Sequence, residues 1–368
     1  MSINIGIIGL PQSGKTTVFN ALTGGKADTI THATDGLSPH IGIAKVPEPR
    51  LKVLDEMLHP KKLVPAEARY IDVGASVKTL ALDKGIGGEL LNQLSTVDTL
   101  ICVVRSFTDE SIPHPEGSLD VRRDIGTLNM ELIFSDLAIM ERRLEKLETS
   151  LKGAKPQERQ GFLQEKNILM RFKVDLENDK PIRELDMEPA AARIITNYQF
   201  LTAKPLLIVV NIGEEQLPGA ASLEAELNTQ YSGTKCRVIT LCGKLEMELA
   251  QMEESEAAEF RADFGIKEPG LERTIKTSYE LSNLISFFTI ASNEVKAWSI
   301  RKDTTAVKAA GKIHTDMEKG FIRAEGIGFK DLVKCGGIAE AKKQGLLRLE
   351  SKDYVIQDGD IITFLFNV

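Results

Sequence analysis

The sequence has little cysteine, little histidine and no long apolar run. Its four cysteines form no CxxC pair, and its five histidines are scattered without the spacing of a metal site. Buried, reduced thiols are therefore expected rather than a disulfide framework. No apolar segment approaches the roughly 18 residues of a membrane span, and the N-terminus lacks the basic and apolar regions of a signal peptide. We predict a cytoplasmic chain with no membrane partner.

The chain also lacks an excess of positive charge. Its formal net charge is −7, which argues against a general nucleic-acid coat and against a specific DNA partner. The segment 284–368 is the least acidic part and is the face we expect for an RNA-rich partner. With 42% apolar and 27% charged residues, the 368-residue chain is long enough for two or three globular domains.

The N-terminal segment contains one specific motif. Residues Gly9–Thr16 spell GxxxxGK[ST], after the apolar run Ile3–Ile8 and before a helical segment from Thr17 to Leu22. A strand, a loop and a helix in this order are the setting of a phosphate-binding loop. The segment predicts a nucleoside triphosphate site in an α/β domain with a mostly parallel sheet.

Each residue type in this loop has a physical task. Gly9 and Gly14 let backbone N–H groups curve around an anion, and the helix that begins near Lys15 adds its positive dipole end. Lys15 supplies a charge to the β- and γ-phosphates and is the predicted catalytic residue, while the Thr16 hydroxyl is a predicted Mg²⁺ ligand. The residues expected to contact nucleotide here are Gly9, Pro11, Gln12, Ser13, Gly14, Lys15, Thr16 and Thr17.

A second Mg²⁺-side carboxylate is expected at the end of a later strand. The segment 67–73 is predicted to be that strand, and it places Asp72 near its end. The polar loop 24–40 is where a first switch would lie, with Thr29, Thr31 and Thr34 as candidate contacts to Mg²⁺ or the γ-phosphate. A second switch is expected after Asp72, in a loop that contains the glycines Gly74, Gly85, Gly87 and Gly88.

Base recognition is predicted after the apolar strand 206–210. Guanine-specific GTPases carry Asn-Lys-x-Asp there, and the aspartate accepts from guanine N1–H and the 2-amino group. This chain has Asn211, Ile212 and the longer acid Glu214, which argues for ATP over GTP or for relaxed choice, because adenine lacks the donors that a carboxylate would meet. A backbone loop over the base is expected at Cys242 and Gly243.

The middle of the chain changes character. Leu137, Met140, Leu144, Leu147 and Leu151 recur at spacings of three and four among charged residues, a coiled-coil seam. Phe162, Leu169, Phe172 and Leu176 resume the seam after a break at 152–156, so an inserted antiparallel helical hairpin is predicted. In the last third, two predicted β-hairpins around helices indicate a small α+β module, and the second hairpin joins 354–356 to 361–366 through the turn Asp358-Gly359.

The order of these parts resembles the Obg-like ATPases of the YchF type. The resemblance is carried by Gly9–Leu22, Val46–Leu51, Asn211–Glu214 and Cys242–Glu246, and above all by Lys296–Arg301, Ile313–Glu325 and Asp353–Val368. It implies a P-loop domain (1–123 and 205–283), an inserted coiled-coil arm (124–204) and a C-terminal ubiquitin-like β-grasp (TGS) domain (284–368). It also implies ATP binding with slow hydrolysis, Mg²⁺ as cofactor, and a regulatory role on the ribosome or its large subunit.

The sequence departs from that family at its switches. The usual loop Gly-Leu-Pro-Asn-Val-Gly-Lys-Ser has Gln12 and Ser13 in place of Asn-Val, the first-switch threonine aligns with Gly36, and the γ-phosphate glycine of the second switch is Ala75. No residue replaces the glutamine that positions water in Ras-like enzymes. A nucleotide-binding interaction protein with negligible turnover, a GTPase and, less favoured, a small-molecule kinase therefore remain alternatives to a slow ATPase.

Overall fold

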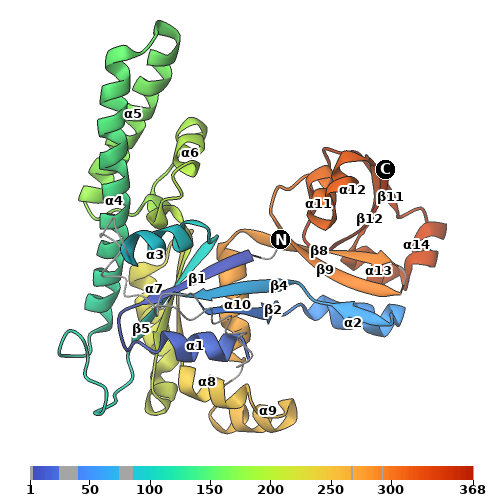
Figure 1. Cartoon of the computed structure of the whole chain (residues 1–368). Coiled ribbons are helices and arrows are strands. Elements are labelled where there is room, and N and C mark those ends of the chain that lie inside the picture. Colours follow the sequence, from blue (N-terminus) through green and yellow to red (C-terminus); the bar gives the residue numbers. More distant parts are fainter. Residues whose placement is uncertain (1–2, 25–39, 74–85, 267, 292, 368) are drawn as a thin grey trace. The chain divides into compact units, whose positions relative to one another are not determined.

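The computed structural model describes residues 3–24, 40–73, 86–266, 268–291 and 293–367 (Figure 1). The chain divides into two compact units. The larger unit contains Asn4–Gly42 and Tyr70–Thr274, and the smaller contains Met1–Ile3, Ile43–Arg69 and Ile275–Val368. Among the described residues, no helix is long and apolar enough to cross a membrane.

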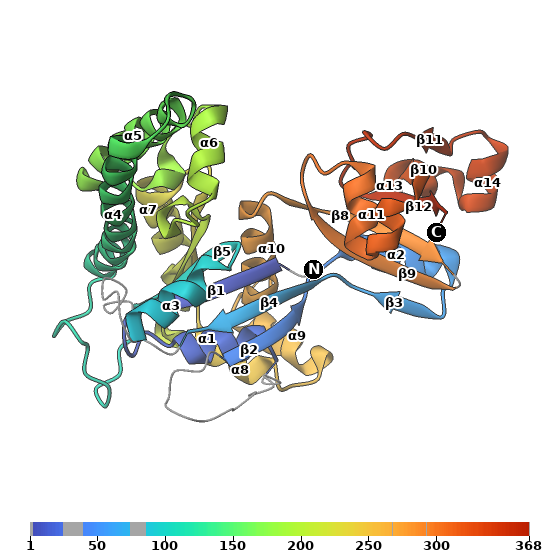
Figure 2. The same ribbon diagram turned by 45° about the horizontal axis from the view of Figure 1, so that its top comes forward.

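A sheet with the strand order β2-β4-β1-β5-β6-β7 carries the phosphate loop (Figures 1 and 2). Neighbouring strands from β1 to β7 run parallel, with Ile7 opposite Ile101 and Val103 opposite Val209. Every residue of β5 is buried, as the continuous apolar strand of a covered parallel sheet requires. The strands are β1 (Ile3–Gly9), β2 (His40–Lys45), β4 (Glu67–Asp72), β5 (Thr99–Arg105), β6 (Leu206–Asn211) and β7 (Cys236–Leu241).

Helices cover this sheet through one continuous apolar core. Leu94, Leu128 and Leu227, from three different helices, pack with the strand residues Ile208 and Val238 in this core. Each helix therefore buries one apolar stripe against the sheet. The helices that contribute to this core are α3 (Ile86–Ser95), α4 (Val121–Gly153), α7 (Ala220–Tyr231), α8 (Gly243–Leu249) and α9 (Glu254–Asp263). The remaining elements are α1 (Lys15–Leu22), the 3₁₀ segment η4 (Glu214–Gly219) and α10 (Gly270–Leu281), and α10 continues into the smaller unit from Ile275.

The predicted helical hairpin is present in the larger unit as α4 (Val121–Gly153) and α5 (Pro156–Glu177), which lie side by side (Figures 1 and 2). Ion pairs from Arg143 to Glu165 and from Glu141 to Lys173 show that the two helices run antiparallel, because one number rises as the other falls along the pair. The predicted seam is confirmed, since Met140, Leu147, Leu169, Phe172 and Leu176 are fully buried in a core of their own.

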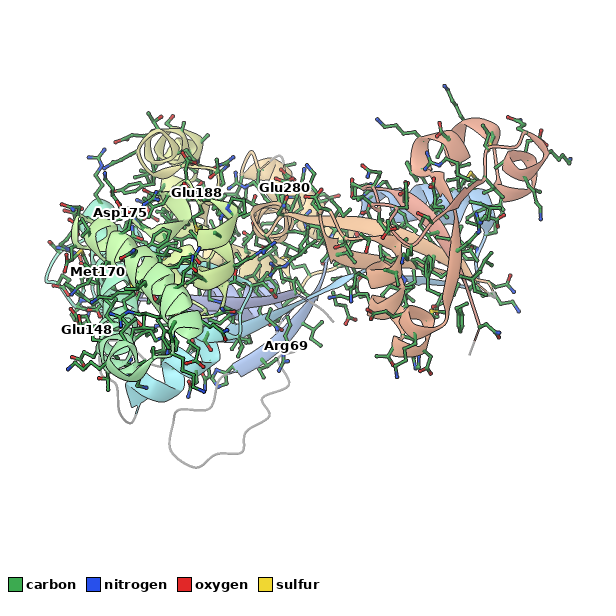
Figure 3. The ribbon with its side chains drawn as sticks, turned by 90° about the horizontal axis from the view of Figure 1, so that it is seen from above. Arg69, Glu148, Met170, Asp175, Glu188 and Glu280 are labelled. Carbon is green, nitrogen blue, oxygen red and sulfur yellow. The ribbon has the colours of Figure 1, made fainter. Side chains whose placement is uncertain are left out.

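The outer surface of this hairpin is mostly polar. Figure 3 shows Glu148 and Asp175 on it, together with Met170, whose side chain is exposed. The charged positions that flank the seam therefore form the solvated face that the sequence pattern predicts. The hairpin returns to the sheet through η2 (Ile182–Glu184), α6 (Pro189–Thr196) and η3 (Leu201–Ala203).

The smaller unit is an α+β module around a sheet with the order β11-β10-β12-β8-β9-β3. Phe287, Ile300, Ala309 and Phe364 are buried in its core. Its elements are α2 (Pro49–Leu58), β3 (Lys62–Val64), β8 (Leu284–Ala291), β9 (Glu294–Arg301), α11 (Ala306–Ile313), α12 (Thr315–Lys319), β10 (Phe321–Gly328), α13 (Phe329–Cys335), α14 (Ile338–Lys343), β11 (Arg348–Glu350) and β12 (Asp360–Phe366).

One of the two predicted hairpins in this module is wrong. β8 and β9 form an antiparallel hairpin as expected, but 354–356 does not pair with 361–366. Val355 instead bridges to Thr305, while β12 pairs antiparallel with β10 and parallel with β8. The Asp358-Gly359 turn is real, with Gly359 at φ 88°, but a turn motif constrains only its own residues and does not choose the partner strand.

Candidate functional site

The phosphate loop joins β1 to α1 as the motif predicts. Gly14 is at φ 85°, a conformation that favours glycine, and a Cβ there would collide with the Asn211 side chain. A Cβ on Gly9 would lie 2.5 Å from the Val103 carbonyl oxygen. Both glycines of the motif are therefore required by close approach to β5 and β6, in addition to any approach to an anion.

Lys15 begins α1, and its side chain folds back over the loop. Its Nζ donates to the Gly9 carbonyl oxygen over 3.1 Å. Burial lowers the pKa of the Lys15 ammonium, while the Asp72 carboxylate acts in the opposite direction. Among the described residues, the lysine ammonium is thus held at the loop by a hydrogen bond to one backbone carbonyl, from which a phosphate oxygen can displace it.

Thr16 and Asp72 meet although they are far apart in sequence. Thr16 Oγ1 donates to Asp72 Oδ2 over 3.1 Å, and His40 Nδ1 lies 3.9 Å from the same oxygen. Asp72 is 1% exposed, and its other oxygen, Oδ1, is buried with no hydrogen-bond partner among the described residues. Burial raises the pKa of the Asp72 carboxyl, against the lowering effect of Thr16 and Lys15.

This pair fits a divalent cation. A hydroxyl and a carboxylate with an unpartnered oxygen are the donor set that Mg²⁺ takes from P-loop proteins. A cation there would also offset the cost of burying the Asp72 carboxylate, of which one oxygen has no partner among the described residues. The predicted metal ligands Thr16 and Asp72 are therefore brought together by the fold, and His40 is a neighbour that the sequence analysis did not single out.

Asn211, at the end of β6, is a junction between three loops. Its Nδ2 donates to the Ser13 carbonyl oxygen over 3.1 Å, and its Oδ1 accepts from the Gly243 N–H over 3.0 Å. The amide still has one further donor hydrogen and one lone pair. Asn211 thus positions the phosphate loop against Cys242 and Gly243, while its contact with a base remains a prediction.

The other predicted base-side residues differ in exposure. Ile212 is buried in the main apolar core, so its backbone alone can face a nucleotide. Glu214 is partly exposed, and its Oε1 lies 3.6 Å from Lys244 Nζ. Cys242 is also buried and precedes α8. Glu214 is therefore the predicted base-edge group whose side chain is free to reach a ligand.

The remaining residues of the phosphate loop differ in how exposed their side chains are. Pro11 and Gln12 are exposed, Thr17 is half-buried, and Ser13 is buried with its Oγ unpartnered among the described residues. Gln12 is at φ 62°, a left-handed conformation that a non-glycine residue adopts only at some cost. The departure from the family's Asn-Val thus falls on the most strained part of the loop.

A histidine–carboxylate pair lies against this loop and was missed from the sequence. His114 Nε2 lies 2.9 Å from Asp124 Oδ2, and both side chains are nearly fully buried. They lie close to Pro11, Ser13 and Arg105. His114 belongs to no motif, and only its proximity to the first turn of α4 could have suggested it.

Several predicted switch residues fall outside the residues that the structure describes. They are Thr29, Thr31, Thr34 and Gly36 of the first switch, and Gly74, Ala75 and Gly85 of the second. Gly87 and Gly88 were predicted to lie in the second-switch loop, but α3 begins at Ile86 and includes them. Their helical position corrects that prediction.

These features place the chain among the P-loop nucleotide-binding proteins. Residues 4–116 match a family model described as a 50S ribosome-binding GTPase. Residues 284–367 match the model YchF-GTPase_C, described as a protein of unknown function (DUF933).

Full-length relatives narrow the class to one family. The chain is 38% identical over 370 residues to the "Ribosome-binding ATPase YchF" of Bacillus subtilis and 34% identical over 368 residues to that of Escherichia coli O157:H7, covering 100% of each protein. It is also similar to the solved Schizosaccharomyces pombe YchF GTPase, with a TM-score of 0.83, 30% identity, and coverage of 99% of this chain and 98% of that one. The chain belongs to the YchF family.

Proposed function

We propose that this chain is a ribosome-binding ATPase that acts as a slow regulatory switch in the cytoplasm. The observation that carries the proposal is the meeting of Lys15, Thr16 and Asp72 at the carboxyl edge of a parallel sheet. Full-length relatives named ribosome-binding ATPases support ATP as the nucleotide and the ribosome as the partner. A ribosomal partner in turn supports the proposed cytoplasmic location.

The residues of the site divide the work between binding and charge stabilisation. Backbone N–H groups of Gly9–Thr16 and the start of α1 would hold the phosphates. Lys15 would exchange the Gly9 carbonyl for phosphate oxygens and offset the charge that develops on the transferred group. Thr16 and Asp72 would hold Mg²⁺, which supplies further positive charge to the β- and γ-phosphates.

Base choice rests on Glu214. Its carboxylate meets no donor on the Watson–Crick edge of adenine other than the 6-amino group, whereas guanine offers N1–H and the 2-amino group to an acid of the right length. We therefore propose ATP as the preferred nucleotide and GTP as the weaker one.

The domain assignment completes the proposal. We take 1–123 and 205–283 as the nucleotide domain, 124–204 as the coiled-coil arm and 284–368 as a TGS-type domain. The six-stranded sheet of the smaller unit and the family model that matches 284–367 support the assignment of the C-terminal domain. Contacts with the ribosome or its large subunit are proposed for the arm and this domain.

The proposal is tested by equilibrium binding of ATP and GTP with Mg²⁺ and by single-turnover hydrolysis on the same sample. Tighter ATP binding that is lost in Lys15→Ala, with slow turnover, is the expected result. The variant Glu214→Asp should raise GTP affinity relative to ATP, and Glu215→Asp, on the exposed neighbour, serves as its control. Tighter binding of GTP by the wild-type chain would contradict the base argument.

The second candidate function is a nucleotide-binding interaction protein with negligible turnover. It is favoured by the strained Gln12 and by Gly36 and Ala75 in place of the usual switch residues. Nucleotide binding without detectable hydrolysis, alone and with added ribosomes, would select this alternative.

A further inference from the structure

A second cavity of about 490 Å³ lies in the larger unit, away from the phosphate loop. It opens between the base of the helical hairpin and the start of β7, and Asn129, Arg183, Ile208, Lys235 and Cys236 are among its lining residues. Cys236 begins β7, whereas the phosphate loop follows the end of β1, and these strands belong to one parallel array. The cavity is therefore at the opposite edge of the sheet from the predicted nucleotide site.

Arg183, in η2, is the unusual residue of this cavity. It is 3% exposed, yet its hydrogen bonds go to neutral groups only: Nη2 donates to Asn129 Oδ1 over 2.6 Å and Nη1 to the Thr202 carbonyl oxygen over 3.5 Å. Its Nε is buried with no partner among the described residues, and the carboxylates of Glu184 and Asp136 act on the guanidinium only through space. A buried guanidinium without a counter-ion is expensive, and burial lowers its pKa.

The charged groups around Arg183 do not supply that counter-ion. Asp136 acts on it through space, but its carboxylate already accepts from the backbone N–H groups of Leu201 and Thr202. Glu184 and Asp186 are exposed at the rim. Arg183 thus keeps an unsatisfied positive charge inside the protein.

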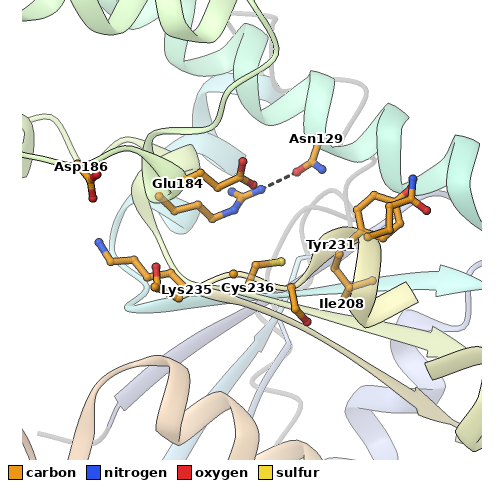
Figure 4. A pocket seen from close by; sticks show the side chains of 12 residues that line it. Asn129, Glu184, Asp186, Ile208, Tyr231, Lys235 and Cys236 are labelled. Carbon is orange, nitrogen blue, oxygen red and sulfur yellow. Dashed lines mark hydrogen bonds between the residues drawn. The ribbon is translucent and has the colours of Figure 1, made fainter. Parts of the chain in front are cut away.

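The rest of the lining suits a small polar ligand. Figure 4 shows Lys235 and Asp186 at one end of the cavity and Tyr231 at the other. The Lys235 ammonium makes no hydrogen bond or ion pair with the described residues, and Ile208 and Cys236 provide a buried apolar floor. A few convergent polar groups over an apolar floor, in several hundred Å³, are typical of a small-molecule site.

We propose that this cavity binds a small metabolite through an oxyanion, a phosphate or a carboxylate, that pairs with Arg183. Phosphate and carboxylate oxygens are the acceptors that a guanidinium pairs with most strongly, and Lys235, which also lines the cavity, adds a second positive charge. Asn129 belongs to α4, whose first turn contains Asp124 beside the phosphate loop and whose later turns form the hairpin. The ligand would therefore sit on the helix that joins the nucleotide site to the arm.

The test measures thermal unfolding of the full chain in phosphate, in glutarate and in chloride at equal ionic strength. It uses the Lys15→Ala background, so that phosphate at the phosphate loop does not contribute. We expect phosphate or glutarate to raise Tm by about 2 °C or more at saturation. Whichever probe acts identifies the oxyanion class, and equal Tm in all three salts would overturn the proposal.

Two further variants tie the response to Arg183. Arg183→Met should abolish it. Asn129→Asp should also abolish it while the protein stays folded, because the new carboxylate sits 2.6 Å from Nη2 and becomes an internal counter-ion. Asn197→Asp, at the exposed residue that follows α6, is the matched control and should keep the full response. A response that survives in Asn129→Asp would contradict the assignment of the site to Arg183, whether or not the chain binds nucleotide.

Discussion

The Thr16 hydroxyl donates a hydrogen bond to Asp72 Oδ2 over 3.1 Å, and this contact joins the end of the phosphate motif to the end of β4. Replacing Asp72 by Asn should lower nucleotide affinity in the presence of Mg²⁺ by at least about tenfold and leave affinity in EDTA nearly unchanged, because the negative charge that holds the cation is lost. Calorimetric titration of ATP with and without Mg²⁺ measures both affinities.

The same variant should not unfold the protein. Burial raises the pKa of the Asp72 carboxyl, which means that the folded state stabilises its negative charge poorly. A neutral amide at this position removes that unfavourable charge. Asp55→Asn, in α2, is the control for the substitution itself. An equal loss of affinity with and without Mg²⁺ would show that Asp72 supports the phosphate loop rather than the cation.

His114 should matter for hydrolysis more than for binding. A histidine held by a carboxylate is the usual arrangement of a general base. His114 Nδ1 accepts from the Glu116 N–H over 3.1 Å and lies 3.5 Å from Arg123 Nη2, so it is the ring nitrogen that faces away from Asp124. We expect His114→Asn to lower single-turnover hydrolysis by about 10²-fold with ATP affinity within about threefold.

The control for that experiment is His59→Ala, at an exposed histidine, which should hydrolyse ATP at the wild-type rate. If His114→Asn weakens ATP binding and hydrolysis in parallel, His114 and Asp124 only stabilise the phosphate loop and take no part in proton transfer.

The sequence predicted the parts whose physics is local. The motif Gly9–Thr16 encodes its own loop, and the apolar spacing of Leu147 and Phe172 encodes the buried seam of the hairpin. Asp72 was found because a strand end is itself a local signal.

Other features depend on distant partners and were missed for that reason. Val355 pairs with Thr305 rather than across the Asp-Gly turn, and no local pattern specifies which strand β12 joins. His114 is notable only through Asp124, and the contact between Asn211 and Gly243 was not predicted although both residues were. The charge of Arg183 is isolated because Asn129, and not an acid, faces it. Such tertiary relationships have no period or motif that a single sequence displays.

Replacing Gln12, whose backbone is in the left-handed region, by asparagine should stabilise the folded protein. Its φ of 62° disfavours a long side chain, whereas asparagine tolerates this region, and the Gln12 side chain is exposed. We expect Gln12→Asn to raise the free energy of unfolding by about 0.5 kcal/mol, measured by urea denaturation without nucleotide. Gln199→Asn, also exposed and at φ 54°, should give a similar gain if backbone conformation is the cause, and a gain at neither position would exclude it.

The free energy of unfolding should fall as the pH rises from about 4 to 6, because the buried Asp136 titrates at a higher pH in the folded protein than in the unfolded chain. Burial raises the pKa of its carboxyl to about 6 in the folded protein, while an aspartate of the unfolded chain titrates near 4. Between these values the folded state binds more protons, so raising the pH from about 4 to 6 removes on the order of 2 kcal/mol of the free energy of unfolding, and the effect is complete above that range.

Asp136→Asn should flatten this slope, because the amide does not titrate between about pH 4 and 7. Urea unfolding between pH 4.5 and 7 measures the slope, with the exposed Asp263→Asn as control. If the wild-type chain and Asp136→Asn show the same slope, the titration of Asp136 is not the source of the pH dependence.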